Sequence, residues 1–89
     1  MELLRKHRIW GENVRKTLQA MKEPIAQLKA GNITIGDCED RLNKIITKAA
    51  FDIPELNDQA RFIRVMKRRG WRMLLNATGK DDLESEVKQ

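Results

Sequence analysis

The stretch QARFIRVMKRRGW, from Gln59 to Trp71, combines a helical pattern with a concentration of positive charge. At 3.6 residues per turn, Phe62, Ile63 and Met66 share one side of a helix. The other side and its edges carry six cations and no acid: Arg61, Arg64, Lys67, Arg68, Arg69 and Arg72. The pattern predicts a basic helix over residues 58–69, with the rest of the chain as the scaffold that presents it.

Gly70 and Trp71 follow the basic run and predict where this helix ends. A glycine just past a helix readily adopts the left-handed backbone that terminates it. Trp71 is placed to fold back on Met66 inside the last turn, a contact that accompanies such a cap. We therefore expect Gly70 to be a C-terminal cap with positive φ.

The basic helix has two interpretations. A run of charge is most often a solvated surface that only keeps a protein soluble. Here the cations lie on one side and no acid interrupts them from Gln59 to Arg72, which makes a phosphate-binding face an equal alternative.

The bulk composition favours a polyanionic partner. The 89 residues are enough for one domain, with a formal charge of +5 and a pI of 9.7. Aromatic residues make up only 4%, without tyrosine, which argues against a stacking surface for single strands. The single cysteine, Cys38, suits a reducing compartment, and we find no membrane span or signal peptide. We expect a soluble, cytoplasmic protein, with a bacterial host as one setting.

Residues 1–30 show a helical pattern along one apolar seam: Val14, Leu18, Met21, Ile25 and Leu28. Pro24 predicts either a kink or two helices that meet there, and Lys29 with Gly31 predicts a stop. The seam favours a helix packed on its own domain. A coiled-coil homodimer through the same helix is the alternative.

Residues 35–50 carry the clearest amphipathic pattern in the chain. Thr34 is placed to cap this helix, with Asp37 three residues later as in a capping box. The apolar stripe consists of Cys38, Leu42, Ile45, Ile46 and Ala49. We expect a helix from about Ile35 to Ala50 in which Cys38 is a buried, unreactive thiol.

Residues 51–57 predict a connector, since Pro54 cannot continue the preceding helix. Asn57 or Asp58 is placed to cap the next helix, or Pro54 begins it a turn earlier. Two helices joined by a turn, the second basic, are typical of a helix-turn-helix. After Trp71, residues 72–75 predict a short strand and residues 76–79 a turn, together a vestigial wing. The acidic residues 81–89 predict a loosely ordered tail.

The sequence lacks the groupings that catalysis or metal binding needs. His7 is the only histidine, and it lies among Arg5, Lys6 and Arg8. Neither a metal site nor a histidine-assisted nucleophile can be assembled from one such residue. We therefore expect no catalytic residues, no metal, no cofactor and no enzyme activity.

The segment from Ile33 to Trp71 resembles a region near the C-terminus of phage replication helicases of the virulence-associated E type. The matched positions are Thr34, Leu42, Ile45, Ile46, Ala60, Ile63, Met66, Gly70 and Trp71. The resemblance implies a helix-turn-helix or winged helix that contacts DNA in a phage or mobile element. This sequence departs from the family in its truncated wing and in having no ATPase portion.

We thus expect an all-α domain of three to four helices over residues 1–80, with a helix-turn-helix core at 33–71. Its predicted function is double-stranded DNA binding in replication or regulation. Arg61, Arg64 and Arg68 would make the principal contacts, Lys67 and Arg72 would bind phosphates, and Arg69 flanks them. The rival is a phage-type protein whose basic face binds a host or defence protein.

Overall fold

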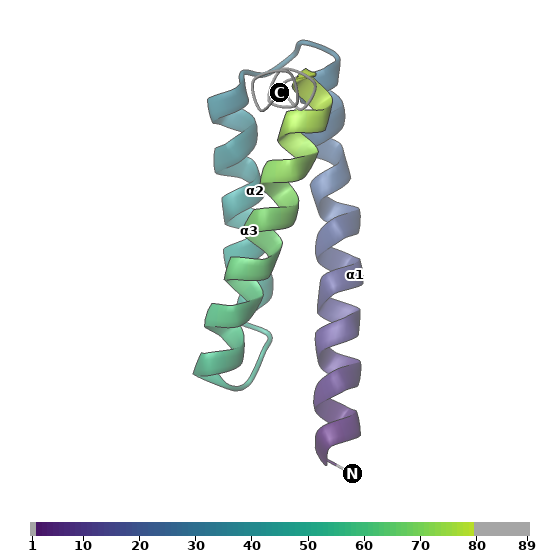
Figure 1. The fold of residues 1–89 in the computed structure, drawn as a ribbon, viewed down its shortest axis with the longest axis vertical. Coiled ribbons are helices and arrows are strands. Elements are labelled where there is room, and N and C mark those ends of the chain that lie inside the picture. Colours follow the sequence, from purple (N-terminus) through teal and green to yellow (C-terminus); the bar gives the residue numbers. More distant parts are fainter. Residues whose placement is uncertain (1, 80–89) are drawn as a thin grey trace, which may run out of the picture.

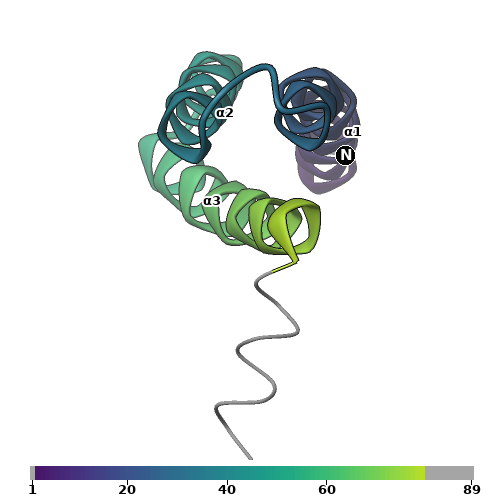
Figure 2. The ribbon, with the colours of Figure 1, turned by 90° about the horizontal axis from the view of Figure 1, so that it is seen from above.

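The protein is a bundle of three helices. The computed structural model describes residues 2–79, with side chains from Arg5 onward, and contains α1 (Glu2–Lys29), α2 (Ile35–Ala50) and α3 (Leu56–Thr78). The helices run up, down and up along the long axis (Figure 1). Seen from above, they occupy the corners of a triangle (Figure 2). The predicted all-α class is confirmed, and the described residues contain no strand.

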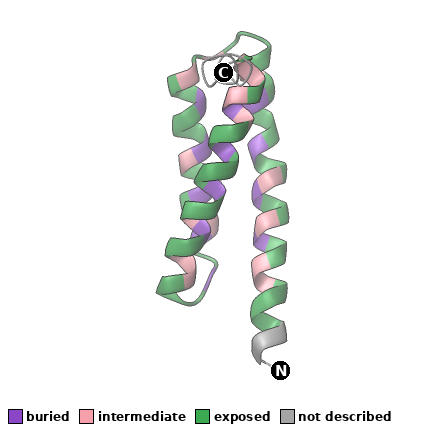
Figure 3. Cartoon of the chain, in the orientation of Figure 1, coloured by how far each residue is buried: buried purple, intermediate pink, exposed green. Residues whose placement is uncertain are grey.

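The core lies on the inner faces of all three helices, where the buried residues gather in Figure 3. The largest fully buried side chains are Phe62, Met21, Ile46, Met66, Thr17 and Cys38. The N-terminal seam contributes Met21 and Ile25 to this core, and its other members pack against it half-buried. The seam therefore packs within its own domain, as the preferred interpretation predicted. None of the described helices is long and apolar enough to cross a membrane.

Helix α1 is one continuous helix. Pro24 lies inside it and is buried, so the alternative of two helices meeting at Pro24 is wrong. The helix ends at Lys29, and Gly31, two residues later, has a φ of 78°. The amide of Gly31 donates to the carbonyl of Leu28 at 3.0 Å, and that of Asn32 donates to Gln27 at 2.9 Å. This pair of bonds is a Schellman cap, and it confirms the predicted stop.

Helix α2 has the predicted bounds. The hydroxyl of Thr34 accepts a hydrogen bond from the amide of Asp37 at 3.1 Å, which confirms the predicted N-cap. Its buried row is Cys38, Leu42, Ile46 and Ala50. Ile45 and Ala49 lie half-buried at the edge of this row.

Cys38 is fully buried, as predicted. Its thiol donates to the carbonyl of Pro24 at 3.5 Å. Burial raises the pKa of the Cys38 thiol, and the charge of Arg41 opposes part of that rise. A protonated, inaccessible thiol is a poor nucleophile, in agreement with the predicted structural role.

Helix α3 is longer than predicted because Gly70 does not end it. The helix runs to Thr78, and Gly79, with a φ of 75°, is the left-handed cap. Gly70 is buried inside α3, where an added Cβ would lie 3.1 Å from Met21 Cε and 3.6 Å from Leu42 Cδ1. Gly70 is therefore a point of close helix packing. The predicted cap there is wrong.

The features predicted downstream of Gly70 are wrong for the same reason. Residues 72–75 continue α3 instead of forming a strand, so the described chain has no wing. Trp71 is 52% exposed while Met66 is fully buried. Both residues lie inside α3, so there is no helix end at which the expected capping contact could form. The predicted tail at 81–89 lies outside the described residues.

The connector between α2 and α3 differs from the prediction in its capping residue. Glu55 occupies the N-cap position of α3 without a side-chain cap bond, and Asn57 and Asp58 lie inside the first turn. The connector is held instead by the side-chain amide of Gln59, whose Nε2 donates to the carbonyl of Ile53, and by an ion pair between Lys6 and Glu55. The predicted caps at Asn57 or Asp58 are wrong, and so is a start at Pro54.

The α2–α3 pair forms a helical hairpin. In Figure 1 the two helices run side by side in opposite directions, whereas a helix-turn-helix crosses its helices at about 90–120°. Phe62, Met66, Gly70 and Leu74 repeat every four residues, so the buried row of α3 extends along most of its length. A long buried row favours lengthwise packing. The predicted helix-turn-helix core is not confirmed.

Candidate nucleic-acid interface

The outward face of α3 carries a dense group of exposed positive charges. Figure 2 shows α1 and α2 on one side of α3 and no other helix on its opposite side. Its side turned away from these helices therefore forms a ridge. All six cations predicted as site residues are exposed: Arg61, Arg64, Lys67, Arg68, Arg69 and Arg72.

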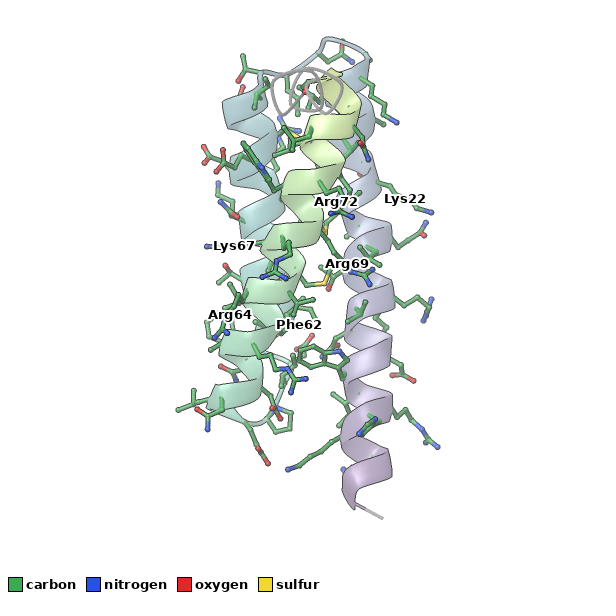
Figure 4. All side chains as sticks on the ribbon, viewed as in Figure 1. Lys22, Phe62, Arg64, Lys67, Arg69 and Arg72 are labelled. Carbon is green, nitrogen blue, oxygen red and sulfur yellow. The ribbon has the colours of Figure 1, made fainter. Side chains whose placement is uncertain are left out.

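The exposed cations form an outer row and two flanks. Arg64, Arg68 and Arg72 are spaced four residues apart and so lie along one line of the helix, with Arg61 one turn earlier. Lys67 and Arg69 lie on either side of this outer row. Figure 4 shows Lys67 directed toward the α2 side and Arg69 toward the α1 side. The structure thus brings all six residues onto one continuous surface.

No acid of α3 neutralises this surface. Asp58 is the last acid before Gly79, and it lies in the first turn, ahead of all six cations. Among the side chains that the structure describes, residues 5–79, the ion pair between Lys6 and Glu55 involves none of the six. Unpaired charges of one sign along one ridge sum to a positive potential that attracts polyanions.

Arg61 is the one member of the set with a positioning contact. Its guanidinium lies over the ring of Trp10 from α1, 5.7 Å from the ring centroid. Trp10 in turn meets Phe62 edge-to-face, with centroids 5.5 Å apart. Arg61 is therefore ordered by the bundle, whereas the other five cations extend without a described partner.

The dimensions of the ridge suit a duplex groove. From Arg61 to Arg72 the helix rises about 16 Å, and a helix with its side chains is about 10–12 Å across. The major groove of B-DNA is about 12 Å wide. Because neither α1 nor α2 projects beyond α3 on this side, the ridge can approach a duplex lengthwise (Figure 2).

Trp71 belongs to the same region, and sequence reasoning missed its role by assigning it to a cap. It is four residues after Lys67 and three after Arg68, a spacing that places these three side chains together on a helix. Its indole borders a groove between α2 and α3. The groove was not foreseeable without the packing of the two helices.

A second hollow lies at the other end of the bundle, between α1 and the start of α3. This cleft of about 460 Å³ is lined by Lys6, His7, Trp10, Glu55, Asp58 and Arg61. It mixes both signs of charge and so lacks the one-sided field of the α3 ridge. The described residues contain no group of three side chains that could hold a metal ion.

Comparison of the chain with protein-family models, curated proteins and solved structures found no match.

Proposed function

We propose that this protein binds double-stranded DNA through the outward face of α3. The observation that carries the proposal is the ridge of six exposed cations without an acid or a salt-bridge partner among the described residues. Cations of this kind displace the counterions condensed on DNA, which supplies sequence-independent affinity. The resemblance to phage replication helicases extends the proposal to replication or regulation in a phage or mobile element.

The arrangement of the cations supports a division of roles. With α3 in the major groove, Arg64 and Arg68 in the middle of the outer row would face the base edges, where arginine pairs with guanine through two hydrogen bonds. Lys67 and Arg69 point to opposite sides and would face the two phosphate backbones (Figure 4). Arg61 and Arg72 would extend the contact along the groove.

The test is the affinity for random-sequence duplex DNA as a function of salt, measured by fluorescence anisotropy. The double variant Arg64→Ala, Arg68→Ala should bind at least about tenfold more weakly, because it removes two cations that displace counterions from the duplex. If both residues contact phosphate, the slope of log affinity against log salt should also fall by roughly two units. Both side chains are exposed, so the fold should persist.

The matched control is the double variant Lys22→Ala, Lys29→Ala, which removes the same formal charge from exposed positions on α1. It should change duplex affinity much less. Equal losses in the two double variants would mean that net charge alone is at work. A wild-type protein that fails to bind duplex near physiological salt would overturn the proposal.

Trp71 favours a second candidate function, binding of a host or defence protein through the same face. Tryptophan and arginine are the residues most enriched at the energetic centre of protein interfaces, and Trp71 is 52% exposed beside Lys67 and Arg68. Pull-down from lysate with and without nuclease separates the two functions. Partners lost after nuclease favour DNA. Partners retained with wild type but lost with Trp71→Ala favour the protein interface.

A further inference from the structure

The cleft between α1 and the start of α3 has a size and a lining that suit a small ligand. Its volume of about 460 Å³ lies within the usual range of about 300–1,000 Å³ for small-molecule sites. Lys6 and His7 line it from α1, one turn before Trp10. Asp58 and Arg61 line it from the first two turns of α3. All five side chains are exposed or half-buried, so a ligand can reach them.

Trp10 provides an aromatic wall in this cleft. Phe62, which is fully buried, supports the indole edge-to-face with ring centroids 5.5 Å apart. The exposed Arg61 lies over the indole, 5.7 Å from the ring centroid. A nucleobase stacks on an aromatic side chain more strongly than an exposed cation does. A base can therefore take the place of Arg61 on the indole, and the freed guanidinium can bind a phosphate.

The charged groups of the cleft complement the two polar parts of a nucleotide. Lys6 and Glu55 form an ion pair, which leaves Asp58 and Arg61 without an ion-pair partner among the described side chains. A carboxylate accepts hydrogen bonds, so Asp58 suits the amino group of a base, whereas the guanidinium of Arg61 suits a phosphate. Cytosine has such an amino donor, and thymine has an acceptor oxygen at the same position. The cleft is therefore expected to favour cytosine over thymine.

Arg61 belongs both to this cleft and to the basic ridge of α3. A duplex that lies along the ridge therefore passes beside the cleft at the first turns of α3. The paired bases of a duplex are stacked on one another, whereas an unpaired base is free to stack on a protein ring. A single-stranded end of a bound duplex can thus enter the cleft, and the duplex itself stays on the ridge.

We propose that this cleft binds one unpaired nucleotide, with its base on Trp10, its amino group on Asp58 and its phosphate on Arg61. Two sources share this chemistry, a single-stranded end of a bound duplex and a free mononucleotide. The first source rests on the duplex binding proposed above, whereas the site itself does not. The carboxylates of Glu55 and Asp58 repel phosphates, so the base is expected to enter between them while the phosphate stays at the Arg61 edge.

The direct test is the NMR signal of the Trp10 indole N–H in the full chain, with Trp71 as an internal reference. The probes are a duplex with a short single-stranded end of cytosines, the same duplex with an abasic end, and deoxycytidine monophosphate alone. The abasic end keeps the phosphates and removes the bases. We expect the cytosine end to shift the Trp10 resonance relative to the abasic end. The Trp71 resonance should coincide in the two complexes.

The mononucleotide distinguishes the two sources. A Trp10 shift with the cytosine end alone identifies DNA as the source. A Trp10 shift with the mononucleotide as well shows that the site also takes the free nucleotide. If neither probe shifts the Trp10 resonance, the nucleotide site is overturned.

Affinity measured by fluorescence anisotropy tests the stacking on Trp10. Wild type should bind the cytosine end at least about fivefold more tightly than the abasic end, because the abasic end has no base to stack. Trp10→Leu, checked for folding by circular dichroism, should bind both ends equally and the abasic end as wild type does. A folded Trp10→Leu protein that keeps the full preference would contradict the stacking.

Asp58→Asn tests the hydrogen bond to the base separately from the charge. The variant removes a negative charge and should bind every DNA somewhat more tightly, yet it should lose the preference for a cytosine end over a thymine end. The matched control is Asp52→Asn, which removes the same charge from an exposed position outside the cleft and should keep that preference. Equal preferences in the two variants would overturn the role of Asp58.

The same measurements separate this site from the duplex binding on the ridge. If wild type fails to bind any duplex while the mononucleotide still shifts the Trp10 resonance, the proposed DNA function fails and the nucleotide site stands. If wild type binds all duplexes alike and no probe shifts the Trp10 resonance, the nucleotide site fails and the duplex binding stands.

Discussion

The two faces of α3 are built from the same four-residue spacing and have opposite chemistry. The inner row consists of Phe62, Met66, Gly70 and Leu74, all buried. The outer row consists of Arg64, Arg68 and Arg72, all exposed. The inner row is fixed by contacts with α1 and α2, so a change there should affect the fold. The outer row has no described salt-bridge partner, so a change there should affect only what the ridge binds.

The largest expected effect comes from the same substitution on adjacent residues of the two faces. Met66→Asp buries a carboxylate without a partner and should destabilise by more than about 4 kcal/mol, which is enough to unfold a domain of this size. Lys67→Asp, one residue later and exposed, should change stability by less than about 0.5 kcal/mol. Circular dichroism and urea unfolding measure both. A folded Met66→Asp variant would contradict the assignment of the inner row.

Gly70 and its exposed neighbour Trp71 allow the two faces to be compared with a smaller expected loss of stability. Gly70→Leu inserts a side chain where a Cβ alone would lie 3.1 Å from Met21 Cε, so overpacking should cost about 1–3 kcal/mol. Trp71→Leu, on the exposed neighbour, should cost less than about 1 kcal/mol. Thermal melting distinguishes them, since 1 kcal/mol corresponds to about 4–8 °C in a domain of this size. Equal melting temperatures would show that Gly70 does not face the core.

A third test compares the glycine of the inner row with the glycine that ends the helix. Gly79→Ala forces an L-residue into a φ of 75° and should destabilise by about 1 kcal/mol. At Gly70, alanine gains about 1 kcal/mol of helix propensity, while the tight contact to the flexible end of Met21 offsets it. The net change at Gly70 should therefore be near zero. If urea unfolding showed a larger loss of stability for Gly70→Ala than for Gly79→Ala, Gly70 would be the cap.

The smallest expected effect lies within the cations themselves. Arg61→Ala removes the guanidinium from the ring of Trp10 and should cost about 0.5–1 kcal/mol, the usual value for an exposed cation–π contact. Arg64→Ala has no such contact and should be near neutral. A double-mutant cycle with Trp10→Leu isolates the coupling energy between Arg61 and Trp10. A coupling energy of zero would show that Arg61 contributes no more to stability than Arg64 does.

The helix ends show what neighbouring residues in the sequence can predict and what they cannot. Thr34 and Gly31 were predicted correctly as a cap and a stop, because each acts through hydrogen bonds to residues within five positions. Gly70, followed by Trp71, carries the same local signal for an end. It was interpreted wrongly because its neighbours in space, Met21 and Leu42, are distant in the chain. The strand and the wing predicted after it failed as a consequence.

The candidate site also has one part that the sequence predicts and another that depends on the packing of the helices. Exposure of the six cations follows from helical periodicity, since residues opposite an apolar row must face solvent. The groove beside Trp71 and the contact of Arg61 with Trp10 depend on pairs of helices, and no spacing within one helix indicates them.

The sequence by itself determined the all-α class, the bounds of α2, the stop of α1 and the exposure of the basic face, because helical periodicity and capping are local. Tertiary structure alone decided that α2 and α3 lie lengthwise as a hairpin, that Gly70 is a packing position, and that α3 extends to Thr78. These features depend on the close approach of residues from different helices. A glycine is compatible with both a left-handed cap and a tight helix contact, and only its neighbours in space select between them.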